Sequence, residues 1–219
     1  MTNIRGFASK LDELQVLLSD NNVDIAVITE TLLNDDIQSN ILQIPGYMLF
    51  RLDRRDGRRG GGVAVGLYAK LGTPCSHQIQ LTHDNLEVIW LLYRQNSMLR
   101  EVTHLLIGAV YHPPEANNFE MSEYLTSNMD IITRSHPNAG ILLLGDFNQL
   151  PECHQKFSPL HQLVTRATRG SSVLDKVFTN VPTWYQIPVL LPTVTRSDHD
   201  TVLLVPTDDP PRPYWNTVK

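Results

Sequence analysis

Polar side chains able to bind a metal ion or a phosphate follow several apolar segments of the chain, at the point where each segment ends. Residues 142–145, LLLG, lead directly to Asp146 and Asn148. Side chains two positions apart on an extended chain point to the same side, so these two can share one site. The other segment ends carry Asn3, Glu30, Tyr111, Asp175, Asp198 and His199. Strand ends that meet at one edge form a rigid concave site, and the pattern predicts one here.

The chemistry available to this set is metal binding combined with proton transfer. Carboxylates grouped together repel one another unless a cation lies among them. Oxygen ligands suit Mg²⁺, and a carboxylate beside a histidine suits general acid–base catalysis. Each residue alone also fits a structural role: Glu30 as a solvated strand end, Tyr111 as a core tyrosine, His199 as a hydrogen-bonded surface residue. The combination, rather than any single residue, therefore indicates a functional site.

Three other kinds of site fit the sequence less well. Residues 197–199, SDH, are sequence neighbours and cannot normally form a hydrolase triad, and no GxSxG motif is present. Residues 57–66, GRRGGGVAVG, lack both nucleotide-loop spacings and lead into a strand. Cys153, His154 and His161 lack a fourth zinc ligand at suitable spacing.

Composition predicts a single intracellular domain. The 219 residues are 42% hydrophobic, enough for one well-buried core. The longest apolar runs, residues 88–93 and 105–111, are far shorter than the roughly 18 residues of a membrane span, and no signal peptide is evident. Two cysteines, Cys75 and Cys153, imply no disulfide framework and favour a reducing compartment.

The charge is unevenly distributed along the chain. The net charge is −5, which argues weakly against a general nucleic-acid-binding protein, although bound cations would cancel part of it. Residues 51–59 nevertheless hold five of the 18 basic residues. A solvated turn with local pairing to Asp53 and Asp56 is one interpretation of this segment, and contact with a DNA backbone is the other. The arginines concerned are Arg51, Arg54, Arg55, Arg58 and Arg59.

Hydrophobic periodicity predicts an α/β fold of two mixed sheets packed face to face with helices outside. Helices are expected over residues 9–22, with Ser9 and Asp12 as a capping box, and over 118–135. A hairpin is expected over 162–180 with its turn at Gly170 and Ser171. The remaining strands are expected at 24–29, 47–51, 61–69, 86–95, 102–111, 140–145 and 200–206. The domain is expected to span residues 1–206, with a first strand that looks cut short, and a proline-rich tail or linker to span 207–219.

The successive motifs NIRG, ITET, VYHPP, LLLGDFN, LDKVFTN and SDH occur in this order over nearly the whole chain. With these motifs the chain resembles the exonuclease–endonuclease–phosphatase superfamily, which includes apurinic endonucleases, deoxyribonuclease I and the endonuclease domains of LINE-type, non-LTR retrotransposons. The pair GDFN and SDH is the most specific part. The segments RRDGRRGGGVAV and YHPP are most similar to the retrotransposon branch. The resemblance implies a four-layered αββα sandwich with the site at the top of the two sheets.

The resemblance also implies a role for each residue. Glu30 resembles the main Mg²⁺ ligand, with Asn3 beside it and Asp198 as a further acid at the metal; Mn²⁺ is a possible substitute. Asp146 resembles the residue that orients or deprotonates the attacking water. The groups expected to contact the phosphate are Asn148, Tyr111 and His199, the last held by Asp175. Thr168 and Arg169 join the five arginines as expected DNA contacts, although the turn before residues 174–175 is shorter than in many relatives.

The function implied is Mg²⁺-dependent nicking of double-stranded target DNA. The nick would leave a 3′-hydroxyl that primes reverse transcription by a downstream domain of the same protein, in the nucleus at the time of action. The alternatives are an apurinic-site repair endonuclease, a phosphatase of the same superfamily, or a catalytically inactive DNA-binding module. The complete set of acids with His199 argues against the inactive module.

Overall fold

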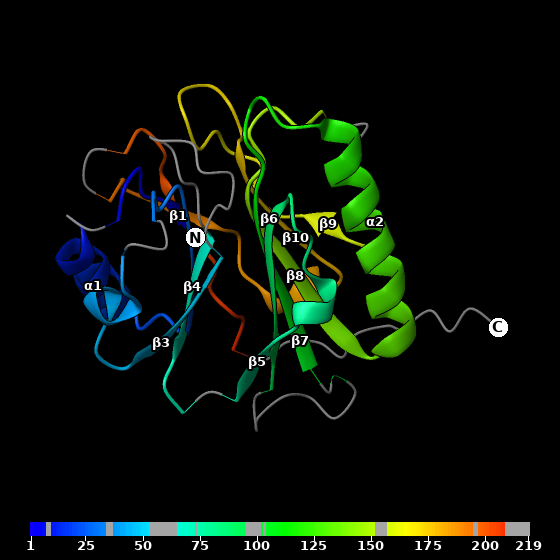
Figure 1. The fold of residues 1–219 in the computed structure, drawn as a ribbon, viewed down its shortest axis with the longest axis horizontal. Coiled ribbons are helices and arrows are strands. Elements are labelled where there is room, and N and C mark those ends of the chain that lie inside the picture. Colours follow the sequence, from blue (N-terminus) through cyan, green and yellow to red (C-terminus); the bar gives the residue numbers. More distant parts are fainter. Residues whose placement is uncertain are drawn as a thin grey trace.

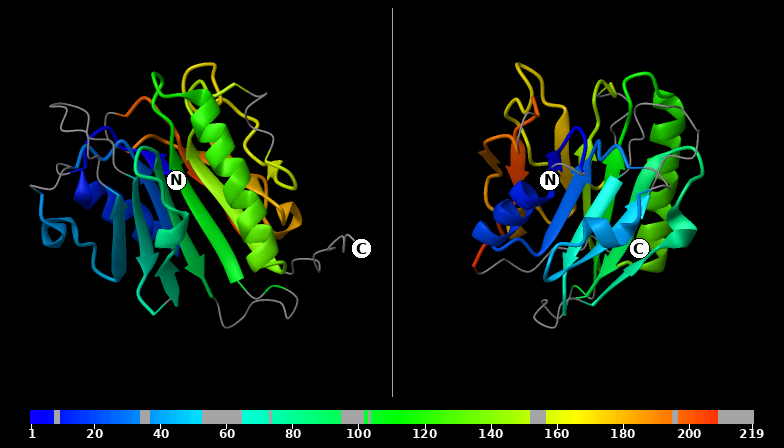
Figure 2. Two further views of the ribbon diagram at one scale, coloured as in Figure 1. Left: turned by 45° about the vertical axis from the view of Figure 1, so that its right-hand side comes forward. Right: turned by 60° about the vertical axis from the view of Figure 1, so that its left-hand side comes forward.

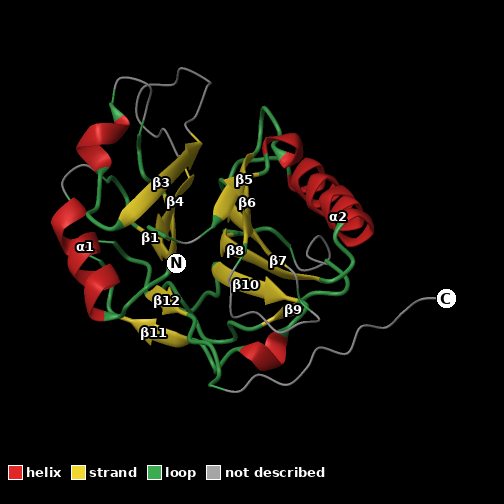
Figure 3. Ribbon diagram, turned by 90° about the horizontal axis from the view of Figure 1, so that it is seen from below, coloured by secondary structure: helices red, strands yellow, loops and turns green. Residues whose placement is uncertain are grey.

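The computed structural model describes residues 1–7, 10–33, 37–52, 65–72, 74–94, 102, 104–151, 157–194 and 197–208. Within these residues two β-sheets pack face to face, with α1 outside one and α2 outside the other (Figure 1). The same order of layers is visible from below, where β11 and β12 lie beneath the first sheet (Figure 3). The expected four-layered sandwich of two mixed sheets is thereby confirmed.

The first sheet has four strands and is covered by α1 (Leu11–Asp20). Its strands, in spatial order, are β1 (Thr2–Asn3), β2 (Ile25–Thr29), β4 (Val65–Lys70) and β3 (Tyr47–Leu52). β1 is parallel to β2, and the other pairs are antiparallel. Leu14 and Leu18 of α1, four positions apart on one helix face, pack on Ala26 and Ile28 of β2.

The second sheet has six strands and is covered by α2 (Asn118–Ser135). Its strands, in spatial order, are β5 (Cys75–His77), β6 (Glu87–Tyr93), β7 (His104–Tyr111), β8 (Ala139–Asp146), β10 (Asp175–Thr179) and β9 (His161–Gln162). Only β7 and β8 are parallel among these pairs, and α2 makes the crossover that parallel neighbours require (Figure 2).

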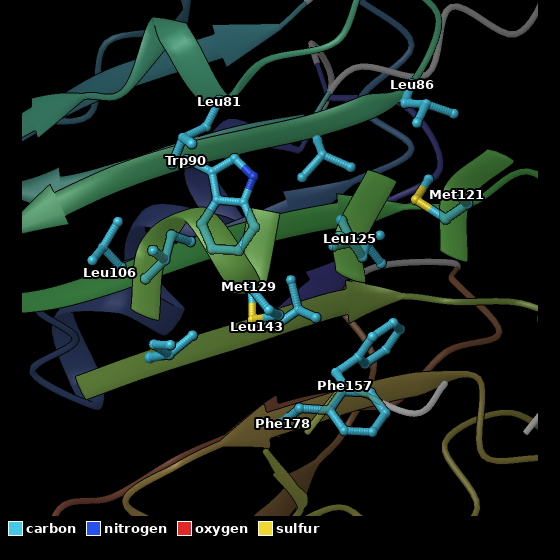
Figure 4. Close-up of a cluster of buried hydrophobic side chains, with 14 of the residues drawn as sticks. Leu81, Leu86, Trp90, Leu106, Met121, Leu125, Met129, Leu143, Phe157 and Phe178 are labelled. Carbon is cyan, nitrogen blue, oxygen red and sulfur yellow. The ribbon is translucent and has the colours of Figure 1, made fainter. Parts of the chain in front are cut away.

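The central strands are apolar throughout because both of their faces are buried. Trp90 of β6 points toward α2 and packs in a cluster with Met129 of the helix and Leu143 of β8 (Figure 4). Its neighbour Leu91 faces the opposite way and belongs to the cluster between the two sheets, with Val27 of β2. This alternation with period two explains why residues 88–93 read as one continuous apolar run.

A third, two-stranded sheet of β11 (Val189–Leu191) and β12 (Thr201–Leu203) lies beside β1. The Met1 ammonium group donates to the Val202 carbonyl at 2.6 Å, and the Val202 amide donates to the Met1 carbonyl at 2.9 Å. Short 3₁₀ helices occupy Ser39–Leu42, Ile79–Leu81 and Pro182–Trp184. In the described part of the chain, no helix has the length and apolar character needed to cross a membrane.

The element boundaries differ from the expectations at a few places. Helix α1 begins at Leu11, and its N-cap Lys10 makes no side-chain cap hydrogen bond. The expected capping residue Ser9 lies outside the described residues. Helix α2 has the expected bounds and is capped by Asn117, whose side chain accepts from two backbone amides. The turn at Gly170 is confirmed by the bridge between Arg169 and Ser172.

Several sequence features fall outside the described residues. They are Asp53, Asp56, Cys153, His154, the glycine-rich segment 57–64, the arginines Arg54, Arg55, Arg58 and Arg59, and all but the first two residues of the tail 207–219.

Candidate active site

Three of the expected site residues lie side by side in one row of the six-stranded sheet. Tyr111 ends β7, Asp146 ends β8, and Asp175 begins the antiparallel strand β10, so all three lie at the same edge. In the strand register Tyr111 is opposite Asp146, and Asp146 is opposite Asp175. Both aspartates are fully buried. The sheet register therefore brings together three residues that are up to 64 positions apart.

The four-stranded sheet supplies Asn3 and Glu30 to the same place. Asn3 ends β1 and is paired with Thr29, the last residue of β2, so Glu30 follows directly after that strand. The Asn3 side-chain amide donates to Asp146 Oδ2 at 2.9 Å, which links the two sheets directly. Tyr111 Oη lies 3.5 Å from Glu30 Oε1. The site is thus built across the junction of both sheets, as the strand-end pattern predicts.

His199 reaches the site from the loop that precedes β12. Its Nδ1 lies 2.8 Å from Asp175 Oδ2, both side chains are fully buried, and its Nε2 has no hydrogen-bond partner. Burial lowers the pKa of His199, but the hydrogen bond to Asp175 and the charges of Asp175, Asp146 and Asp198 outweigh it and raise the pKa above the ordinary value. Asp175 therefore orients the ring and favours the imidazolium form.

Asp146 is the most strongly perturbed acid of the site. Its Oδ1 accepts from the Asn148 backbone amide at 2.9 Å and its Oδ2 from Asn3. Burial, followed by the neighbouring charge of Asp175, raises the pKa of Asp146 to about 7, and the positive charge of His199 partly opposes this. A carboxylate with a pKa near neutrality is suited to accept a proton from water.

Asn148 follows Asp146 by two residues and has a left-handed backbone conformation. Its backbone φ is 43°, and its side-chain amide donates to the His112 carbonyl at 2.9 Å. Between the two, Phe147 is fully buried in the core beneath α2, where it contacts Phe157 and Phe178. Asp146 thus faces the site and Phe147 the core, as expected, but the extended-chain alternation ends before Asn148, whose conformation is left-handed and whose backbone amide holds Asp146.

The donor atoms present fit a divalent metal ion. One ligand atom each of Glu30, Asp146 and His199 lie within 4.8 Å of one another. Asn3 Oδ1, Asp175 Oδ1 and His199 Nε2 are buried without hydrogen-bond partners among the described residues. Buried polar atoms normally have hydrogen-bond partners, so these three atoms fit a site that binds a ligand. Oxygen atoms of carboxylates and an amide are the ligands preferred by Mg²⁺.

Asp198, expected at the metal, lies beside two arginines, and its Oδ1 is 4.0 Å from Nε2 of His199. Its Oδ1 lies 3.2 Å from Arg5 Nη2 and its Oδ2 2.7 Å from Arg169 Nε. Burial opposes ionisation, but a backbone hydrogen bond and these two arginines lower the pKa of Asp198. Asp198 is also absent from the group of three possible ligands. Sequence reasoning missed Arg5, although it stands between Asn3 and Gly6 in the motif NIRG.

The expected DNA contacts are only partly described. Arg51 Nη1 donates to the Ile37 carbonyl at 2.6 Å, which ties this side chain to the protein's own backbone. Thr168 is buried, and its hydroxyl accepts from the Leu174 and Asp175 amides, so it holds the turn and offers no surface to DNA. Arg169 is partly exposed beside Asp198 and remains available.

An apolar cavity of about 690 Å³ lies elsewhere, against α1, β2 and β12. It is lined by residues such as Leu18, Ile25, Tyr93 and Val202, and by none of Asn3, Glu30, Asp146 or His199. The candidate active site is therefore distinct from it.

Comparison with known proteins gives concordant results. The model of the Endonuclease/Exonuclease/phosphatase family matches residues 2–199. The RNA-directed DNA polymerase from mobile element jockey of Drosophila melanogaster is 29% identical over 112 residues, which is 51% of this chain and 11% of that protein. The chain thus spans a small part of the length of this relative.

Two solved structures share the fold. The endonuclease domain of TRAS1, a telomere-specific non-LTR retrotransposon, superimposes with a TM-score of 0.67 and 15% identity, covering 91% of this chain and 92% of that one. The AP endonuclease LMAP from Leishmania major superimposes with a TM-score of 0.70 and 14% identity, covering 92% and 85%. At these identities the likeness concerns the fold.

Proposed function

Because the chain belongs to the Endonuclease/Exonuclease/phosphatase family, we propose that it is a metal-dependent DNA endonuclease that nicks one strand of a duplex. The observation that carries this proposal is the buried, unpartnered Nε2 of His199, which lies in the same group as the Glu30 and Asp146 carboxylates. An unpartnered buried donor beside acids suits an anionic substrate that arrives with a cation.

In the proposed reaction a water oxygen forms a bond to phosphorus while the bond from phosphorus to O3′ breaks. Asp146 orients this water and takes its proton, in keeping with the raised pKa of its carboxyl group. The products are a 5′-phosphate and a 3′-oxygen that takes a proton to become a hydroxyl.

His199 and Tyr111 stabilise the negative charge that develops on the phosphate oxygens. His199 donates from Nε2, since Nδ1 is held by Asp175, and Tyr111 donates from its hydroxyl beside Glu30. Asn148 has one amide hydrogen directed to the His112 carbonyl, which leaves the second for the phosphate.

The metal ion would be held by Glu30 and the unpartnered Oδ1 of Asn3, within reach of Asp146. When bound, Mg²⁺ withdraws charge from the phosphate and the leaving oxygen. Mn²⁺, with similar ligand preferences, is expected to substitute for it.

The similarity to the jockey polymerase supports a role in retrotransposition. We infer that the 3′-hydroxyl left by the nick primes a reverse transcriptase carried by the same polypeptide. This activity requires chromosomal target DNA and hence the nucleus at the time of action.

The test is conversion of supercoiled plasmid to open circles in Mg²⁺, with EDTA as the metal-free control. We expect His199→Ala and Asp146→Ala each to slow nicking by about 100-fold or more. The matched control is Arg134→Ala, an exposed side chain on α2 that pairs with Asp130. Extension of the nick by a DNA polymerase without prior phosphatase treatment reports a 3′-hydroxyl.

A repair function is distinguished by substrate. A strong preference for duplexes with an abasic site over intact duplexes would favour apurinic-site repair. Absence of nicking, or full activity of Asp146→Ala, would refute the endonuclease proposal.

A further inference from the structure

Two arginines converge on one carboxylate at the rim of the candidate site. Asp198 Oδ1 lies 3.2 Å from Arg5 Nη2 and, farther off, 4.0 Å from His199 Nε2, and Oδ2 lies 2.7 Å from Arg169 Nε. Arg5 Nε also lies 3.7 Å from Glu30 Oε2. The side chains of Arg5 and Arg169 are 41% and 38% exposed, so each guanidinium group keeps N–H donors that face solvent.

The backbone at Arg5 is unusual for a residue with a side chain. Its φ is 44°, followed by 99° at Gly6, and the turn is held by the Gly6 amide, which donates to the Glu30 carbonyl at 2.8 Å. Positive φ costs free energy for residues other than glycine and often marks functional positions. Glu30 and Asn148, both at the site, have φ values of 52° and 43°. Arg5 shares this conformation with them.

Arg169 is fixed from a different part of the chain. Its backbone pairs with Ser172 across a turn in which Gly170 has a φ of 56°, and the preceding Thr168 is buried. The Thr168 carbonyl accepts from the Asp200 amide at 2.8 Å, which ties this turn to the loop that carries Asp198. Both arginines are thus held by backbone contacts as well as by the carboxylate.

Cations at the rim favour the binding of a polyanion there, in addition to a metal ion at Glu30. Glu30, Asp146, Asp175 and Asp198 all lie at or near this edge, and a phosphodiester strand passing there is repelled by them. Arginine offers a planar set of donors that matches the oxygens of a phosphate.

We propose that Arg5 and Arg169 form a binding subsite for a backbone phosphate next to the reacting one, and that Asp198 is the positioning residue that holds both guanidinium groups. This inference rests on the proposed endonuclease function. It assigns Asp198 to the arginines instead of to the metal ion.

DNA binding tests the subsite. Affinity for a fluorescein-labelled 20-base-pair duplex is measured by anisotropy in EDTA over a series of salt concentrations. Each lost phosphate contact lowers the slope of log affinity against log salt by about 0.9. We expect this change for Arg5→Ala and for Arg169→Ala, and none for Arg134→Ala, which removes the same charge from α2. Unchanged slopes in Arg5→Ala and Arg169→Ala would overturn the subsite.

A double-mutant cycle tests the role of Asp198. If Asp198 acts through the arginines, Asp198→Ala changes the KM for DNA in the native background and has no further effect in the Arg5→Ala/Arg169→Ala background. The affinity of Asp198→Ala for Mn²⁺, measured by titration calorimetry without DNA, then stays within about twofold of the native value. Glu30→Gln instead lowers the affinity for Mn²⁺ by about tenfold or more. A tenfold loss of Mn²⁺ affinity in Asp198→Ala would instead make it a metal ligand.

The wild-type protein separates the two proposals. If it neither binds nor nicks DNA, the endonuclease proposal itself fails. If it does both and the arginine variants match it, the subsite alone fails.

Discussion

Asp175→Asn removes one charge from the most buried part of the site while keeping the shape of the side chain. Asp175 Oδ2 lies 2.8 Å from His199 Nδ1, and neither side chain is exposed to solvent. The amide oxygen of asparagine can still accept from Nδ1, but it no longer favours the imidazolium form. The substitution therefore tests whether the charge of Asp175 contributes to catalysis.

The expected loss follows from the kind of hydrogen bond that is weakened. Hydrogen bonds to charged groups contribute about 1.5–3 kcal/mol. If the imidazolium stabilises charge only as it develops, this loss falls on the transition state. Since 1.36 kcal/mol is a factor of ten in rate, we expect kcat to fall about 10- to 150-fold with KM nearly unchanged.

The assay is steady-state nicking of a labelled duplex, with DNA affinity measured separately by anisotropy. Asp130→Asn on the exposed face of α2 is the matched control. In a His199→Ala background, Asp175→Asn should have a smaller effect on kcat, confined to Asp146, whose pKa the charge of Asp175 also raises. A kcat within about threefold of wild type, or a loss confined to KM, would refute the reasoning. Urea unfolding of the same preparations excludes loss of folded protein as the cause.

Three further predictions concern stability. Gly145→Ala should destabilise the protein by about 3 kcal/mol or more in urea unfolding, because a Cβ would lie 1.8 Å from the Val110 carbonyl oxygen. The control is Gly66→Ala, whose Cβ would make only ordinary contacts, at 3.6 Å and beyond. Equal losses of stability in the two variants would contradict the prediction. Asn117→Ala should cost about 1 kcal/mol by removing the cap of α2, with Asn117→Ser restoring most of it. Burial lowers the pKa of His112 in the folded protein. The contribution of neutral His112 to stability is therefore fully present above the unfolded pKa of about 6.5 and is lost as the pH falls from there toward the folded pKa. Between pH 7 and 5 the melting temperature of His112→Gln should fall less than that of wild type, and an equal fall would exclude His112 as the cause.

Much of the fold could be predicted because local patterns determine it. The apolar runs of the central strands and the bounds of α2 follow from periodicity and capping, which depend on residues close in sequence. The start of α1 could not be predicted in the same way: Ser9 fits an N-cap by type, yet the helix begins after Lys10. The end residue of a helix varies by one or two positions, so residue type near the end does not determine it.

The candidate site was predictable as a set of residues but not as a set of contacts. Position at or beside the ends of apolar segments identified Asp146, Asp175 and His199, although Asp175 begins its strand and His199 lies in a loop. The link from Asn3 to Asp146 and the pairing of Asp198 with arginines depend on strand register and loop paths, which residue types do not specify. Arg5 was missed because its side chain is unremarkable in sequence and only its left-handed backbone and its partners distinguish it.

The hydrogen bonds between Met1 and Val202, 201 positions apart, also constrain when the site can form. Asn3 is placed by contacts to Asp146, and His199 arrives only with the last strand. During synthesis at about 5–20 residues per second, β1 emerges well before β12, so the candidate site residues meet only after β12 has been made. Contacts between such distant segments slow folding. A chain that ends before His199 therefore contains the candidate acids Glu30, Asp146 and Asp175 without the histidine, so the candidate site is complete only once β12 has joined the sandwich.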